Sequence, residues 1–438
     1  MFSRLRVLWR ARGTRPRSTA HSIESAAPAE HVSVVRVEST AAAKAGPTAV
    51  RGRQKLVVLG MMTRHPVAGI VWLTMQYMVG LARLGYDVYY VEAHGGTPKM
   101  FMREGDEDGS RGAAAFLDTV FKRFDLADRW ALQAFHSDGQ YYGLSETRVK
   151  ALYDEAALIF NLHGGTTPRP EHVRTNRLVY LGTDPVEREI ALHQNDKEIH
   201  DLFAAHAVFF TWGENYGNPD CAVPVSNEFH LMPTRQPVVL DFWKPNGTPP
   251  GDLFTTVGSW RQLWREVNLN GETYAWSKHH EFLKFVDLPS RTDQRFELAL
   301  AGCDGEDRAL LERHGWQVRD GLTISADMDD YRQYVFRSRG EFTVAKDQNV
   351  RLRSGWFSDR SATYLAAGRP VVTQDTGFGN ILPTGEGLFG FNDVASAVDA
   401  LERINADHPR HSRAARAIAR EHFDHERVLT KLLADIGI

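Results

Sequence analysis

The sequence is poor in cysteine and has no long apolar run, and both absences narrow the possible folds. Its 438 residues hold two cysteines, Cys221 and Cys303, too few for a disulfide framework or a cysteine-based zinc site. No stretch approaches 18 uninterrupted apolar residues, so we expect no membrane span. The 52 Lys+Arg nearly balance the 55 Asp+Glu, which argues against nucleic acid as the main partner. These features predict a soluble, cytoplasmic protein of two or three domains.

The first 52 residues differ in composition from the rest. Residues 1–20 carry six arginines and no acid, and Ala- and Ser-rich sequence follows. No continuous apolar segment resembles the core of a secretory signal. We expect residues 1–52 to form a disordered basic tail, with weak contact to a membrane surface as a further possibility.

A strand–helix–strand pattern begins at residue 55. Residues 55–60 are apolar and β-branched, residues 70–84 place apolar side chains on one helical face, and residues 87–92 read as a second strand. Such a βαβ unit requires a parallel sheet. The pattern recurs, with further strands predicted at 158–162, 177–181, 207–211, 253–258, 295–300, 341–345 and 369–373, and helices near 196–205, 275–286, 306–314, 327–337 and 358–367.

A proline-rich stretch at about 233–251 divides the pattern into two halves. We therefore predict an α/β fold with two Rossmann-like, doubly wound domains that face a cleft, followed by C-terminal helices. The expected domains are 53–238, 239–420 and a last helix at 421–438. Ligands of such sheets bind at the carboxyl ends of the strands.

The most informative stretch is residues 346–378. Ser358 is a good N-cap for a helix over 359–367, and a helix N-terminus offers unpaired N–H groups that suit a phosphate. Arg353 and Arg360 add charge that can bind a phosphate through two N–H groups at once. The end of the next strand supplies groups that can bond hydroxyls, at Gln374, Asp375, Thr376 and the flexible Gly377.

The run from Ser354 to Val372, with its Ala-Ala-Gly-Arg-Pro-Val-Val ending, resembles the donor-binding motif of GT-B glycosyltransferases, in particular bacterial family 1 and family 4-like enzymes. The earlier Leu-Ala-Arg-Leu-Gly-Tyr-Asp-Val at 81–88 is similar to their acceptor-side opening. The resemblance implies a nucleotide-diphosphate sugar as co-substrate, with no cofactor and no metal. It places Ser358, Asp359, Arg360 and Ser361 at the diphosphate, Gln374, Asp375 and Thr376 at the sugar, Lys346 at a phosphate, and Gly258, Ser259 and Trp260 in the loop that opens the donor domain.

One departure from that family concerns acidic residues. Many retaining family 4 enzymes carry two glutamates at positions that here hold Gly355 and Thr363. The resemblance therefore does not extend to that acidic pair.

Three residues are candidates for catalysis on the other domain. His65 lies in the loop after the first strand, where inverting relatives often place a general base, and a neutral imidazole suits that task near pH 7. The alternative is a loop histidine that contacts solvent or caps the next helix. Asp184 and Glu214 also follow predicted strands, as do Glu92 and His163. The Asp-x-Asp at 327–329 is explained by a helix start, so we expect no metal site there.

The expected function is metal-independent transfer of a sugar from a nucleotide-diphosphate donor to a small-molecule or glycan acceptor. Two alternatives stay open. One is a nucleotide-sugar epimerase on the same fold, and the other is a non-catalytic protein that binds nucleotide sugars as the partner of another transferase.

Overall fold

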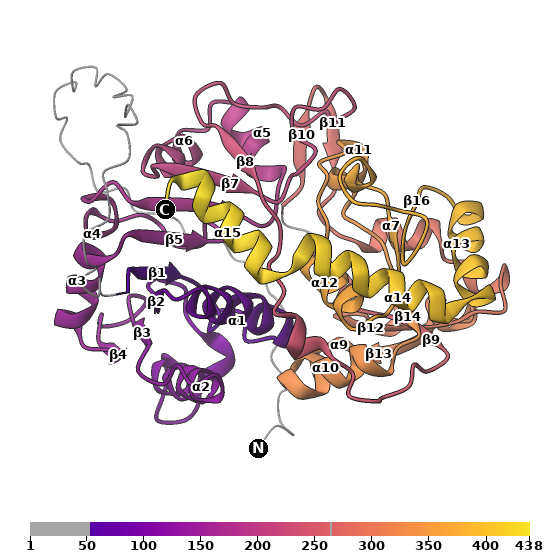
Figure 1. Ribbon diagram of the computed structural model, residues 1–438, viewed down its shortest axis with the longest axis horizontal. Helices are drawn as coiled ribbons and strands as arrows, with labels where there is room; N and C mark the ends of the chain where they lie inside the picture. Colours follow the sequence, from indigo (N-terminus) through magenta and orange to yellow (C-terminus); the bar gives the residue numbers. More distant parts are fainter. Residues whose placement is uncertain (1–52, 263–264) are drawn as a thin grey trace, which may run out of the picture. The chain divides into compact units, whose positions relative to one another are not determined.

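The computed structural model describes residues 53–262 and 265–438 (Figure 1). The expected tail at 1–52 and its membrane contact lie outside the described residues. The first sheet has the order β4-β3-β2-β1-β5-β6-β7-β8, and every neighbouring pair is parallel except β3 and β4. Its strands are β1 (Lys55–Leu59), β2 (Asp87–Glu92), β3 (Trp130–Gln133), β4 (Tyr141–Gly143), β5 (Leu158–Leu162), β6 (Leu178–Gly182), β7 (Val208–Thr211) and β8 (Leu231–Pro233).

Helices cover this sheet because its central strands are buried on both faces. Strands β1, β5 and β6 are apolar almost throughout, as a parallel sheet requires. Helix α1 buries most of its length, including Trp72 and Tyr77. The helices are α1 (Ala68–Arg83), η2 (Lys99–Phe101), α2 (Ser110–Arg123), α3 (Glu146–Glu155), α4 (Pro170–Val173), α5 (Glu187–His193), α6 (Lys197–Ala204) and η3 (Leu240–Trp243).

The second sheet has six parallel strands in the order β13-β12-β9-β14-β15-β16. They are β9 (Leu253–Ser259), β12 (Arg295–Ala301), β13 (Gln317–Asp320), β14 (Gly340–Thr343), β15 (Val371–Gln374) and β16 (Leu388–Phe391). A short hairpin, β10 (Val267–Leu269) and β11 (Glu272–Tyr274), is inserted after β9. The flanking helices are α7 (His279–Lys284), η4 (Leu288–Ser290), α8 (Gly305–Arg313), α9 (Gly321–Ser325), α10 (Met328–Arg337), α11 (Asp347–Arg351), α12 (Asp359–Ala366) and η5 (Phe378–Asn380).

The chain passes between the two sheets twice, and the two crossing segments touch. The C-terminal helices are α13 (Val394–Ala406), α14 (His408–Ile418), the π-helical turn η6 (Ala419–Phe423) and α15 (His425–Ile436). Helix α15 returns to pack on α1, so residues 54–438 form one compact unit (Figure 1). The amide of Val238 donates to the carbonyl of Phe423 (2.7 Å), and the amide of His425 donates back to Val238 (3.0 Å).

Both sheets reverse their strand order at a central strand. In the first sheet β1 lies between β2 and β5, and in the second β9 lies between β12 and β14. Ligands of doubly wound sheets bind at the carboxyl ends beside such reversals. The predicted α/β architecture of two Rossmann-like halves is confirmed.

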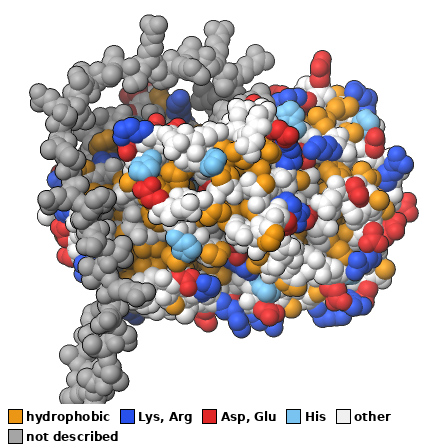
Figure 2. Space-filling view, turned by 90° about the horizontal axis from the view of Figure 1, so that it is seen from above, with side chains coloured by type: hydrophobic (Ala, Val, Ile, Leu, Met, Phe, Trp, Pro, Cys, Tyr) orange, Lys and Arg blue, Asp and Glu red, His pale blue; other side chains and the backbone are white. Residues whose placement is uncertain are grey.

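The surface carries no large field of one sign on the face seen in Figure 2. Lysine and arginine alternate there with aspartate and glutamate along the edges, with apolar and histidine side chains between them. Among the described residues, no helix is both long enough and apolar enough to cross a membrane.

Gly355 is required by a close approach between the halves. Its φ is +79°, and a Cβ there would lie 2.3 Å from the backbone nitrogen of Asn215. No glutamate can occupy this position without moving the chain, which accounts physically for the missing acidic residue.

We expect Gly355→Ala to lower the free energy of unfolding by about 1–3 kcal/mol, because it adds both backbone strain and overpacking. Denaturant unfolding measures the change. Gly69→Ala is the matched control: Gly69 is helical and has no atom within 4 Å of the added Cβ, so this variant should be about 0.5–1 kcal/mol more stable. Equal stability of the two variants would contradict the packing explanation.

Candidate active site

The loops at the carboxyl ends of the two sheets meet in one place, which we call the junction. Lys346, after β14, places its Nζ 2.7 Å from Asp184 Oδ1, after β6. The indole N–H of Trp356 donates to the carbonyl of Thr183 at 3.1 Å. The junction therefore brings together Lys346 and Asp184, which the sequence analysis placed in separate halves. In this structure the two residues bind each other.

The pair formed by Asp184 and Lys346 is an ion pair in which the Lys346 side chain is buried and the Asp184 side chain is partly exposed. Burial lowers the pKa of Lys346, with Asp184 opposing. Burial acts to raise the pKa of Asp184, but Lys346 and Arg265 outweigh it, and the pKa is lowered overall. A carboxylate held ionised by two cations is a poor proton acceptor, so this pairing does not favour Asp184 as a general base, and its catalytic role stays a prediction. The positive charge of Lys346 is likewise compensated by the Asp184 carboxylate in this structure.

The amino end of α12 keeps free hydrogen-bond donors. Ser358 occupies the N-cap position, but its hydroxyl makes no capping bond to the backbone. The hydroxyl of Ser361 is buried and has no partner among the described residues. Asp359, half-buried beside them, has its pKa raised by burial, with Arg360 opposing. The helix end and the Ser361 hydroxyl together offer what a phosphate oxygen needs.

Arg360 faces the second sheet in this structure, and its role at the phosphate stays a prediction. Its guanidinium forms a buried ion pair with Glu341 and donates to the carbonyl of Val257 (2.7 Å) and the hydroxyl of Thr343 (2.9 Å). Arg360 therefore ties α12 to the ends of β9 and β14.

Arg353 and Asp375, predicted at the phosphate and at the sugar, bind each other in this structure. Arg353 has φ +49° and places Nη1 2.9 Å from Asp375 Oδ2. Its Nε donates to Asp220 at 2.7 Å. The two carboxylates raise the pKa of Arg353. These groups join the halves rather than remaining available to a donor.

The remaining groups of the turn after β15 are also used inside the protein. Gln374 accepts from the amide of Ala345 (3.2 Å) and donates to Glu281 (2.7 Å). Thr376 donates to the carbonyl of Trp356 (2.6 Å). Gly377, at φ +91°, packs against Asn215. The side chains of Gln374, Asp375 and Thr376 are therefore engaged within the protein, and their contacts with a sugar stay a prediction.

The predicted donor loop at 258–260 is only in part a loop. Gly258 and Ser259 are the last residues of β9, at the carboxyl edge and half-buried. Trp260 is fully buried and packs on His279 and Phe282. Its indole is part of the core of the second half, which corrects its expected place in the site.

Lys278, immediately before α7, is a site residue that the sequence did not reveal. Its ammonium lies 5.4 Å from the centre of the Trp356 ring and forms no ion pair in the described part of the chain. Burial, Arg360 and Lys346 hold the pKa of Lys278 well below its ordinary value. The sequence feature that could have revealed Lys278 is its position: it is a lysine at the start of a helix near the carboxyl end of the sheet, where an acidic residue is usual.

His65 lies exposed on the loop between β1 and α1, as predicted, and its ring has no hydrogen-bond partner within residues 53–262 and 265–438. Desolvation, Arg64 and His94 lower the pKa of His65 below 6.5. The loop itself is fixed by Glu92, whose buried carboxylate accepts from the amide of Thr63 (3.0 Å). His65 is therefore a neutral imidazole near pH 7 on a fixed loop.

His163, after β5, is the second histidine of the site. Its φ is +63°, its Nδ1 lies 2.7 Å from the Thr183 hydroxyl, and its Nε2 is buried without a partner among the described residues. Burial lowers the pKa of His163 to about 4. The Asp184 carboxylate opposes this shift, and His65 adds to it. Thr183 links His163 to the junction, because its hydroxyl contacts the His163 ring and its carbonyl accepts from the Trp356 indole.

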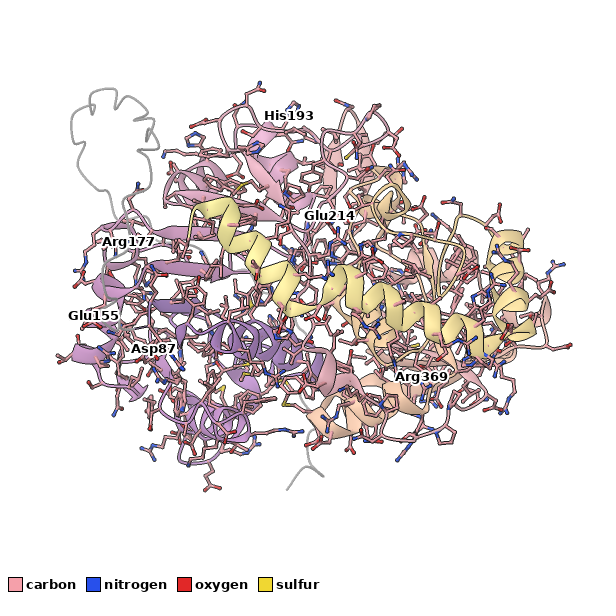
Figure 3. All side chains as sticks on the ribbon, viewed as in Figure 1. Asp87, Glu155, Arg177, His193, Glu214 and Arg369 are labelled. Carbon is pink, nitrogen blue, oxygen red and sulfur yellow. The ribbon has the colours of Figure 1, made fainter. Side chains whose placement is uncertain are left out.

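Glu214 is held away from that group. Both Nε and Nη2 of Arg235 bond Oε2 of Glu214, which is labelled in Figure 3, at 3.0 and 2.6 Å. Arg235 also lies over the ring of Phe423 in the second crossing. Burial raises the pKa of Glu214, with Arg235 opposing. This carboxylate braces the crossing segments, which corrects its predicted catalytic role. Asp327, in the Asp-x-Asp segment, caps α10 by accepting from the amide of Asp329 (2.7 Å).

No model of a known family matches the sequence, and no curated protein matches it. Solved structures do. HepE of Anabaena, in complex with UDP-glucose, is 12% identical over 88% of this chain and 99% of that one, with a TM-score of 0.51. An alpha-glucosyltransferase in complex with UDP-glucose and DNA is 9% identical over 89% and 100%, with a TM-score of 0.51. Sucrose-phosphate synthase of Thermosynechococcus elongatus is 12% identical over 88% and 99%, with a TM-score of 0.50. At these identities the likeness shows the fold, which is GT-B.

Proposed function

We propose that the protein is a glycosyltransferase that takes a sugar from a nucleoside-diphosphate donor without a metal ion. The observation that carries the proposal is Lys278, whose Nζ lies 5.4 Å from the centre of the Trp356 ring and forms no ion pair among the described residues. A leaving diphosphate at this position would gain Lys278, the free N–H groups of α12 and the Ser361 hydroxyl. Donors fixed in advance at the site of developing charge are the largest single contribution in many enzymes.

In the reaction, an acceptor hydroxyl oxygen would form a bond to the anomeric carbon of the sugar while the bond from that carbon to the diphosphate oxygen breaks. The electron pair of the broken bond leaves with the nucleoside diphosphate. The hydroxyl proton would pass to the neutral His65 ring, and His163 Nε2 would bond a hydroxyl of the bound sugar or acceptor. A small-molecule or glycan acceptor fits the polar groups of this region.

Replacing Lys278 with alanine should weaken UDP, GDP or TDP binding by roughly 10- to 100-fold, because a charge-assisted contact of about 1.5–3 kcal/mol is lost. Isothermal titration of each diphosphate against the wild type and Lys278→Ala measures this. Lys122→Ala, an exposed helical lysine paired with Asp118, is the control and should bind as the wild type does. If no diphosphate binds the wild type, or Lys278→Ala binds equally well, the proposed site is wrong.

The same titration tests the protonation of Lys278. Since the pKa of Lys278 is held low in the free protein, a bound diphosphate should raise it, and the complex should take up a proton at pH values between the two pKa values. Titrations in buffers of different ionisation enthalpy detect that proton, and it should be absent in Lys278→Ala.

A further inference from the structure

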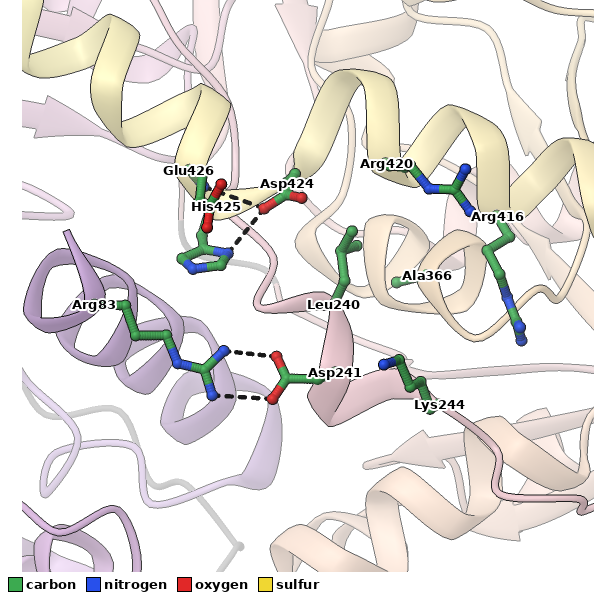
Figure 4. Close-up of a pocket in the computed structure, with 10 residues that line it drawn as sticks. All are labelled: Arg83, Leu240, Asp241, Lys244, Ala366, Arg416, Arg420, Asp424, His425 and Glu426. Atoms are coloured by element: carbon green, nitrogen blue, oxygen red, sulfur yellow. Dashed lines mark hydrogen bonds and ion pairs between the residues drawn. The ribbon is translucent and has the colours of Figure 1, made fainter.

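A cavity of about 460 Å³ lies beside the two crossing segments, apart from the junction (Figure 4). Its walls come from α1, the segment from η3 to residue 244, the carboxyl end of α12, and the chain from α14 to the start of α15. Its volume is in the range of sites for small molecules, which is about 300–1,000 Å³.

Two of the three acidic groups of this cavity, Asp241 and Asp424, are engaged by the protein, and the third, Glu426, is exposed and forms no ion pair among the described residues. Asp241 binds Arg83 through two parallel contacts, at 2.6 and 2.9 Å. Asp424 lies 2.9 Å from His425 Nδ1 and accepts from the amide of Glu426 at 3.2 Å. Figure 4 shows these contacts grouped on the side of the cavity nearest α1 and α15.

Three cations remain on the other side without an ion pair among the described residues: Lys244, Arg416 and Arg420. Arg416, at the end of α14, and Arg420, in the π-helical turn η6, both line the cavity. A further cation, the buried guanidinium of Arg369, has its pKa lowered to about 10 by burial and by Arg416. An isolated surface arginine needs no explanation, but this gathering of like charges around a cavity does.

We propose that this cavity binds a phosphate-bearing small molecule. The two guanidinium groups of Arg416 and Arg420 match the geometry of phosphate oxygens, and Lys244 adds a third charge from the opposite wall. The ligand would contact both crossing segments, one through Lys244 and the other through the two arginines. The proposal does not depend on the function proposed for the junction.

Inorganic phosphate is the probe, titrated into the full chain by calorimetry at low salt, with sodium chloride of equal ionic strength as the reference. Arg416→Ala/Arg420→Ala should bind phosphate at least roughly tenfold more weakly, because two charge-assisted contacts are removed. Arg413→Ala/Arg427→Ala removes the same charge from exposed positions outside the cavity and should bind as the wild type does. Lys278→Ala should also bind as the wild type does, which separates this site from the junction.

Three results would overturn the proposal. One is a wild type that responds to phosphate no more than to chloride. Another is equal loss of phosphate binding in the two double variants, which would show that binding depends on the total charge of the protein and not on this cavity. The third comes from vesicles: if Arg416→Ala/Arg420→Ala loses sedimentation with phosphatidylglycerol vesicles while free phosphate binds neither protein, the cations serve a lipid headgroup instead. The proposal expects no vesicle sedimentation that depends on these two arginines.

Discussion

Replacing Arg360 with alanine should lower the free energy of unfolding by about 3–5 kcal/mol, because removal of one partner leaves a buried charge without compensation. The partner left behind is Glu341, whose side chain is fully buried in β14. Two further contacts disappear with the guanidinium, those to Val257 and Thr343. Denaturant unfolding followed by circular dichroism should show the loss as a lower midpoint with an unchanged slope.

A double variant separates the contribution of the Arg360–Glu341 ion pair to stability from that of its surroundings. Arg360→Met/Glu341→Leu removes both charges and keeps apolar volume, so it should be more stable than Arg360→Ala. If Arg360→Ala instead unfolds like the wild type and loses only nucleotide affinity, its guanidinium contacts the ligand and does not hold α12 to the second sheet.

The sequence predicted the fold well where short apolar runs alternate with amphipathic helices. Strands β2 and β5 begin and end at the predicted residues, because buried parallel strands need continuous apolar, β-branched segments. Elements with weaker patterns were not predicted, among them β3, β4, α2, α3, β8, the β10–β11 hairpin, β13 and β16. Strands of three or four residues, such as β16, depend on the neighbours with which they pair rather than on their own sequence.

The sequence predicted where helix α12 of the candidate site begins, but not which residues the side chains around it contact. The open amino end of α12 was found because an N-cap serine and a helix start are local signals. The carboxylate partners of Arg353 and Arg360, Asp220 and Glu341, were not predicted because they lie 133 and 19 residues away along the chain. Sequence shows where charges are, and only the fold shows which of them are already paired. Lys278 is the opposite case, a cation that forms no ion pair with a carboxylate in the described part of the fold.

Replacing His65 with alanine should reduce kcat/KM by about 10²–10⁴-fold, the usual contribution of a positioned general base. The imidazole accepts a proton only in its neutral form, and the pKa of His65 is lowered below 6.5. Wild-type kcat/KM should therefore be constant above that pKa and fall as pH drops through it. The measurement is the pH profile of kcat/KM with the donor that titration identifies, and the acidic decline attributed to His65 should be absent in His65→Ala.

The two histidines can be told apart because burial separates their pKa values. A decline at about pH 4 that disappears in His163→Ala and persists in His65→Ala would make His163 the base, since the pKa of His163 is lowered to about 4. His193→Ala, a histidine at the end of α5, should change neither the rate nor the profile (Figure 3). Loss of turnover in His65→Ala with undiminished diphosphate binding would place His65 at the chemical step, because Lys278 and α12 are expected to hold the leaving group without it.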